Sequence, residues 1–149
     1  MRDIRRPESA EPLVERLTNP RMSGTGAPVF STIMDLLIFC AGVGLTTNRR
    51  CAVPSTGKAV PYHIFERNQK DGYIFLVALA EKKDAATLAV ENDDEIIKIF
   101  EEYAAGGLEQ IASWLNENAT DISGVQALIT KIQAQVPVVA PSVQNPSPL

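Results

Sequence analysis

The sequence predicts a mainly α fold: a single small helical domain of five or six helices with a short β-hairpin and a disordered Pro-rich C-terminal tail. Apolar residues recur at helical spacing in several separate runs, and loops rich in glycine and proline separate those runs. One stretch alternates with the period of a strand. A length of 149 residues fits one domain with its own core. We place the helical domain at residues 1–134 and the tail at residues 135–149.

The first two helices begin at residues suited to helix N-termini. Residues 9–18 are the first candidate, with Pro12 in the first turn, where a missing N–H costs no hydrogen bond. The second starts near Thr32, because Thr32 and Asp35 make a capping box. Apolar side chains then cover nearly every face up to Leu45, which is typical of a helix buried in the middle of a fold. We expect this to be the central helix.

A short hairpin is predicted between residues 49 and 66. The candidate strands are Arg49–Val53 and Ala59–Glu66, and Pro54–Gly57 between them has turn chemistry. Side chains of the second run alternate between two faces, but Pro61 has no N–H and confines that run to an edge. We expect the two runs to pair with each other.

Further helices are predicted in the second half of the chain. Asp71 can cap a helix over residues 71–83, and an acidic cluster can cap another over residues 92–105. We expect Gly106–Gly107 to end that helix and a separate one to follow at residues 108–118. A last amphipathic helix covers about residues 121–133, and its apolar stripe either docks on its own core or serves a partner. Its candidate partner-binding residues are Ile122, Val125, Ile129 and Ile132.

Charge divides unevenly along the chain. Residues 1–70 hold ten Lys or Arg against six Asp or Glu, whereas residues 71–149 hold four against twelve. The division predicts either a basic and an acidic face or internal pairing between the two halves. The tail contains four prolines and no charged side chain, so we expect it to be extended and disordered.

No catalytic or metal-binding pattern is present in the sequence. His63 is the single histidine, and a cysteine nucleophile would need it beside Cys40 or Cys51 with a third orienting group. The separated thiols match no metal-ligand spacing. We therefore expect no enzyme, no cofactor and no metal. The two cysteines form no recognised paired motif, which favours a reduced, cytoplasmic setting. No apolar run approaches the ~20 residues that a membrane span needs.

Basic side chains around the predicted hairpin are the remaining functional candidates. Arginine binds phosphate oxygens in a bidentate manner, and lysine supplies point charges. Simple solvated surface is the alternative interpretation. The candidate nucleic-acid-binding residues are Arg49, Arg50, Lys58, Arg67 and Lys70.

Three motifs resemble a known family. They are F-x-T-I-M-D-L-L-I-F at Phe30–Phe39, I-F-E-R-N at Ile64–Asn68 and I-F-E-E-Y-A-x-G-G-L at Ile99–Leu108. Together they are similar to the family of DNA phosphorothioation-associated protein 4, over roughly residues 2–118. Members of that family are encoded beside the dnd genes, whose products replace a nonbridging phosphate oxygen of bacterial DNA with sulfur. The resemblance implies a role in a bacterial anti-phage modification and restriction system and carries over no catalytic motif.

Two functions are consistent with these observations. In the first, the protein is a non-catalytic adaptor that docks on other proteins of the dnd modification and restriction system through its acidic second half and last helix. In the second, it is an accessory or regulator that contacts the backbone of double-stranded DNA through the basic residues near the hairpin. The overall acidity of the chain favours the adaptor.

Overall fold

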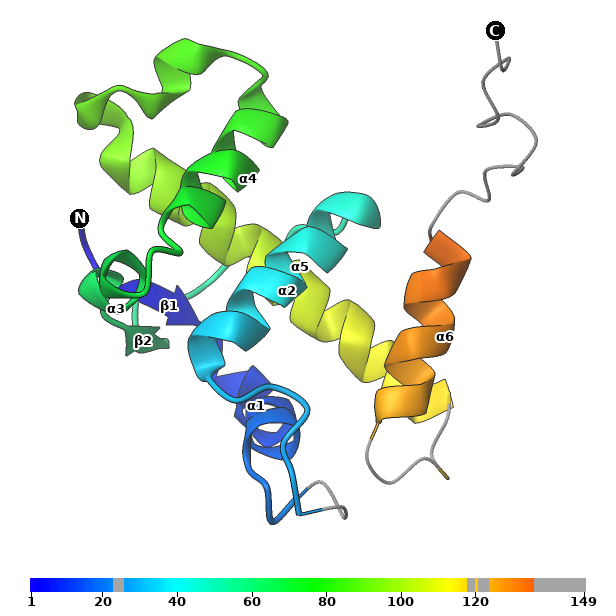
Figure 1. Ribbon diagram of the computed structural model, residues 1–149. Coiled ribbons are helices and arrows are strands. Elements are labelled where there is room, and N and C mark those ends of the chain that lie inside the picture. Colours follow the sequence, from blue (N-terminus) through cyan, green and yellow to red (C-terminus); the bar gives the residue numbers. More distant parts are fainter. Residues whose placement is uncertain (23–25, 118–119, 121–123, 136–149) are drawn as a thin grey trace, which may run out of the picture.

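Two long helices, α2 and α5, cross at the centre of the molecule, and the other elements pack around them (Figure 1). The computed structural model describes residues 1–22, 26–117, 120 and 124–135. Residues 136–149 of the predicted Pro-rich tail lie outside these residues, and its first residue, Gln135, belongs to a helix. The α-helices are α1 (Glu11–Thr18), α2 (Ile33–Thr46), α3 (Tyr62–Arg67), α4 (Gly72–Lys82), α5 (Asp93–Glu117) and α6 (Val125–Gln135). Single turns of 3₁₀ helix are η1 (Glu8–Ala10), η2 (Ala85–Leu88) and η3 (Val90–Asn92), and the strands are β1 (Ile4–Arg6) and β2 (Lys58–Val60).

Helix α2 has the predicted cap and the predicted central position. The Thr32 hydroxyl accepts a hydrogen bond from the backbone N–H of Asp35 at 3.0 Å, which satisfies one of the donors that a helix start leaves open. Leu36, Leu37 and Cys40 are fully buried. Helix α2 packs more extensively on α5 than on any other described element. The six α-helices and one two-stranded sheet of the described residues confirm the mainly helical class.

Helix α5 is continuous, so the prediction that Gly106–Gly107 ends a helix is wrong. A Cβ at Gly107 would lie 1.8 Å from the carbonyl oxygen of Cys40, and one at Gly106 would lie 1.9 Å from that of Arg49. The two glycines therefore let the backbone of α2 and the segment after it approach α5. Burial of the crossing outweighs the modest loss of helix propensity at glycine.

The predicted hairpin is also wrong in its pairing, although a two-stranded antiparallel sheet is present. Strand β2 pairs with the N-terminal β1, with Ile4 opposite Val60. The predicted turn is formed, because Gly57 N–H donates to the Pro54 carbonyl at 3.0 Å. Pro61 then ends the strand and precedes α3, because proline lacks a ladder donor yet suits a helix entry.

Tertiary packing explains why residues 62–67 are helical. A helix places Phe65 in the core, where its ring meets Phe100 of α5 edge to face at 5.9 Å between centroids. Residues 49–53 form no strand; instead, Cys51 N–H donates to the Glu102 carbonyl at 3.0 Å, which holds this segment against α5.

Substitution at the crossing tests its tightness. We expect Gly107→Ala to lower the free energy of unfolding by about 3 kcal/mol or more, because the added methyl group overlaps backbone that cannot rotate away. Gly42→Ala is the matched control: it lies on an exposed part of α2 with no atom within 4 Å of a new Cβ. It should stabilise the protein by roughly 0.5–1 kcal/mol. Urea unfolding of both variants measures the difference, and similar midpoints would contradict the close crossing.

Candidate functional site

The predicted phosphate-binding arginines beside α2 are engaged with carboxylates of the second half of the chain. Arg49 Nη2 lies 3.1 Å from Glu109 Oε2. Arg50 lies 2.8 Å from Glu102 and 3.0 Å from Glu81, and its guanidinium stacks 5.5 Å from the ring centroid of Tyr103. Arg49 therefore joins the segment after α2 to α5, and Arg50 joins it to both α4 and α5.

The other three predicted basic residues lie in the segment from β2 to the start of α4. Lys58 Nζ is 3.6 Å from Glu11 of α1, and Lys70 Nζ is 2.6 Å from Asp35 of α2. Arg67 is exposed and has no ion pair within the described residues. Four of the five candidates thus belong to separate ion pairs, and the role of all five in DNA binding stays a prediction.

Glu101 is the most deeply buried carboxylate among the ion pairs of the described residues. No role was predicted for it from the sequence. It accepts two hydrogen bonds from the Arg2 guanidinium, at 2.8 and 2.9 Å, and one from the Arg5 backbone N–H at 2.5 Å. The hydrogen bonds with Glu101 are the main cause that raises the pKa of Arg2 above its ordinary value. The N-terminal strand is thereby fixed on α5. The ion pairs of Arg2, Arg49 and Arg50 link the basic half of the chain to the acidic half. Internal pairing was one of the two expected outcomes of the charge division.

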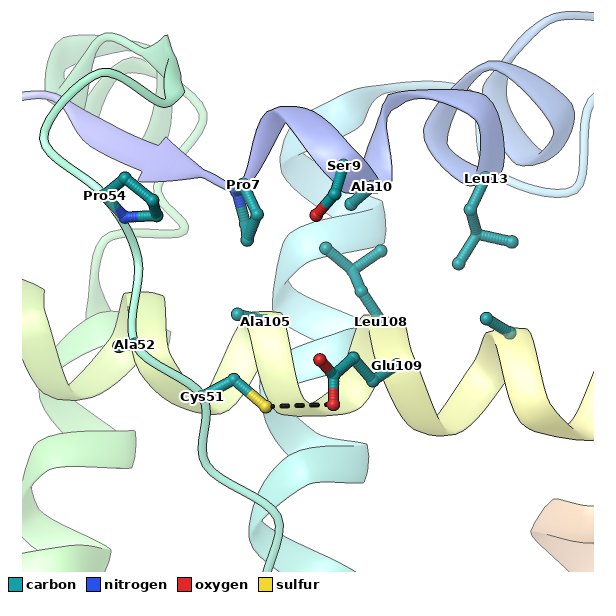
Figure 2. Close-up of a pocket in the computed structure, with 11 residues that line it drawn as sticks. Pro7, Ser9, Ala10, Leu13, Cys51, Ala52, Pro54, Ala105, Leu108 and Glu109 are labelled. Carbon is teal, nitrogen blue, oxygen red and sulfur yellow. Dashed lines mark hydrogen bonds between the residues drawn. The ribbon is translucent and has the colours of Figure 1, made fainter.

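A largely apolar groove of about 270 Å³ lies between the N-terminal segment, residues 51–54 and α5 (Figure 2). Its polar lining includes Ser9 and the Cys51 thiol, which donates to the Glu109 carboxylate at 3.1 Å. Burial and then this carboxylate raise the pKa of Cys51, so the thiol stays protonated at neutral pH. Burial alone raises the pKa of Cys40. The environments of both thiols oppose formation of a nucleophilic thiolate.

Neither a metal site nor a membrane span is found in the described part of the chain. No group of three or more His, Cys, Asp or Glu side chains there is arranged to hold a metal ion. None of the described helices has the length and apolar character needed to cross a membrane.

Helix α6 divides its predicted apolar stripe between the core and solvent. Leu128 is buried and Ile132 is half-buried against the core. Val125 and Ile129 are 41% and 42% exposed. Ile122, the fourth predicted partner-binding residue, lies outside the described residues. Both expected uses of the stripe are therefore compatible with one helix.

Helix α4 presents a second exposed apolar surface that sequence reasoning missed. Tyr73 and Leu76 are 49% and 58% exposed, while Ile74 and Val77 of the same helix are buried. The available signal was the absence of charge from Gly72 to Ala80, since a surface helix normally carries a polar outer face. We call Tyr73, Leu76, Val125 and Ile129 the apolar surface residues.

Comparison with known families identifies the chain. It matches the family described as DNA sulphur modification system-associated protein 4 over residues 3–137. The chain belongs to this family. Comparison with curated proteins and with solved structures finds no match. The family match extends beyond the range of roughly 2–118 that the three motifs covered, and it includes α6. Association with the DNA sulphur modification system is thus assigned to this chain, and α6 is part of what the family shares.

The Lys70–Asp35 ion pair gives a pH-dependent prediction. The hydrogen bond from Lys70 lowers the pKa of Asp35 below its ordinary value of 3.8, so the stabilisation is present above about pH 4 and is lost as the pH falls through the lowered pKa. At pH 7 Lys70→Met should cost roughly 0.5–1 kcal/mol of the free energy of unfolding. The difference from the unchanged protein should shrink toward zero in acid.

Arg67→Met is the matched control for that measurement, because Arg67 is a nearby cation with no ion pair within the described residues. It should change the free energy of unfolding by less than about 0.5 kcal/mol at either pH. Denaturant titrations at neutral and acid pH measure both variants. A Lys70→Met deficit that is the same at the two pH values would contradict the assignment.

Proposed function

We propose that this protein is a non-catalytic adaptor of the DNA sulphur modification system, which docks on other proteins of that system through exposed apolar side chains of α4 and α6. The observation that carries the proposal is the exposure of the four apolar surface residues on helices whose opposite faces are anchored in the core. Side chains held in this way are pre-organised for contact, which lowers the entropy lost on binding.

The size of the exposed groups suits protein recognition. Tyrosine and large aliphatic residues dominate the energetically important parts of interfaces, and full burial of one such side chain contributes about 1.5–3 kcal/mol. Tyr73 and Leu76 lie three residues apart on one face of α4, and Val125 and Ile129 lie four apart on α6. Each pair can therefore occupy one partner groove as a helical unit.

Electrostatics support the adaptor over the alternative, a DNA-binding accessory. Arg49, Arg50, Lys58 and Lys70 are each paired with a carboxylate, so a phosphate would have to displace an existing partner. The net charge of the chain is −4, which opposes approach to a polyanion. A non-catalytic role is proposed because both thiols are held protonated and the sequence contains no recognisable catalytic constellation.

Affinity purification from cells that contain the intact modification system tests the adaptor. The tagged protein should recover another protein of that system, and the double changes Tyr73→Ser with Leu76→Asp, or Val125→Asp with Ile129→Asp, should reduce recovery at least tenfold. Met22→Asp is the matched control, because Met22 is exposed, apolar and outside both helices. Unchanged recovery with both double variants, at unchanged thermal stability, would rule out these surfaces.

Fluorescence anisotropy tests the DNA-binding alternative. With plain and phosphorothioated duplexes at about 50 and 200 mM salt, we expect no binding at micromolar protein, because four of the five candidate cations are already paired with carboxylates. Binding that weakens with salt and disappears in the Arg49→Glu, Arg50→Glu double variant would favour the DNA-binding accessory. Circular dichroism must show that this variant remains folded, since both arginines also hold α5.

A further inference from the structure

A second groove, separate from the apolar surface residues, combines an apolar lining with two arginine side chains. It holds about 410 Å³ and lies between the start of α2, the end of β2 and α3. Its apolar lining includes Ile33, Met34, Val60 and Ile64, and its cationic lining consists of Arg6 and Arg67.

Arg6 carries an unsatisfied polar group at this groove. Its side chain is only 7% exposed, and Nε donates to Glu11 Oε1 at 2.6 Å. The Nη1 group of the same guanidinium is buried and has no hydrogen-bond partner among the described residues. A buried donor without an acceptor is destabilising, so a ligand acceptor that Nη1 meets when the guanidinium turns toward the groove gains more than it would at the surface.

Two further features of the groove favour negative charge. Arg67 is exposed and without an ion pair within the described residues, so it is available to a ligand. The first turn of α2 lines the groove through Thr32, Ile33 and Met34, and the N-terminal end of a 14-residue helix carries partial positive charge. The nearby Asp35 carboxylate opposes an anion, but Lys70 at 2.6 Å neutralises it.

We propose that this groove binds an acidic, partly apolar peptide segment of a partner protein, with its carboxylate between Arg67 and Arg6 and its apolar side chain beside Ile33 and Ile64. The apolar lining separates a peptide from a nucleic-acid backbone, which offers phosphates but no aliphatic side chains. Strand β2 has β1 as its one neighbour among the described residues, so its outer edge can pair with an extended peptide. This inference deepens the adaptor function and rests on it.

Binding to peptide arrays tests the inference with the full chain. One array presents short peptides with a single Asp or Glu flanked by Leu, Ile, Val or Phe, and the matched array replaces the acid by Asn or Gln. The protein should bind the acidic array in preference, and Arg67→Gln should weaken binding of the best peptide about tenfold. Arg21→Gln is the control, because Arg21 is an exposed arginine outside the groove.

The position of the bound peptide and the dependence of binding on its carboxylate together decide whether the inference holds. With the best acidic peptide, amide resonances of Ile33, Met34 and Ala59 should shift in a ¹H–¹⁵N spectrum. Failure to bind any acidic peptide, equal binding of both arrays, insensitivity to Arg67→Gln, or shifts confined to other surfaces would each overturn the peptide groove. Duplex DNA that binds the same residues more tightly than any peptide would overturn it in favour of a nucleic-acid site.

The proposed adaptor function is tested separately. Recovery of a partner that depends on Tyr73 and Leu76 would survive failure of the groove. If Arg67→Gln loses the preference for acidic peptides but still recovers the partner, the groove binds acidic peptides and is not needed for recovery of the partner.

Discussion

The close approach of α2 and α5 is the constraint on which the rest of the structure depends. Gly106 and Gly107 carry no side chain where the carbonyls of Arg49 and Cys40 meet α5, and Gly44 of α2 faces the Tyr103 carbonyl in the same way. Because the backbones lie this close, the chain that leaves α2 must run along α5. That path places Arg49, Arg50 and Cys51 opposite Glu102 and Glu109, so the crossing also determines where the charges pair.

The same pairing explains how the basic half and the acidic half of the chain neutralise part of each other's charge within the described residues. Carboxylates of α5 receive Arg2, Arg49 and Arg50, and this long helix connects the N-terminal strand to the segment after α2. Electrostatic attraction is thereby used within the domain, while Tyr73 and Leu76 stay exposed on α4. Exposed apolar side chains are therefore better placed than paired cations to contact a partner. Arg67 differs from the paired cations because it has no ion pair within the described residues.

The motifs that carry the family resemblance are mainly residues that build the core. Phe65 from the second motif meets Phe100 from the third, and the third also contains the buried Glu101 and the crossing glycines. The first motif supplies the cap and the buried face of α2. These residues identify the family through its packing, which explains why they indicate membership in the DNA sulphur modification system-associated protein 4 family and name no reaction.

Local sequence was enough to predict the helical class, the cap at Thr32, the turn at Pro54–Gly57 and the amphipathic stripe of α6, because each depends on neighbours a few residues apart. Tertiary structure decided the rest. A local pattern cannot distinguish a glycine pair that ends a helix from one that admits another backbone, so α5 was predicted as two helices. Strand pairing depends on which distant segment the core brings alongside, so β2 joined β1 instead of residues 49–53. The ion pairs of Arg49, Arg50 and Lys70 likewise form only once distant segments meet, as does the burial of Arg6 Nη1 without a partner among the described residues.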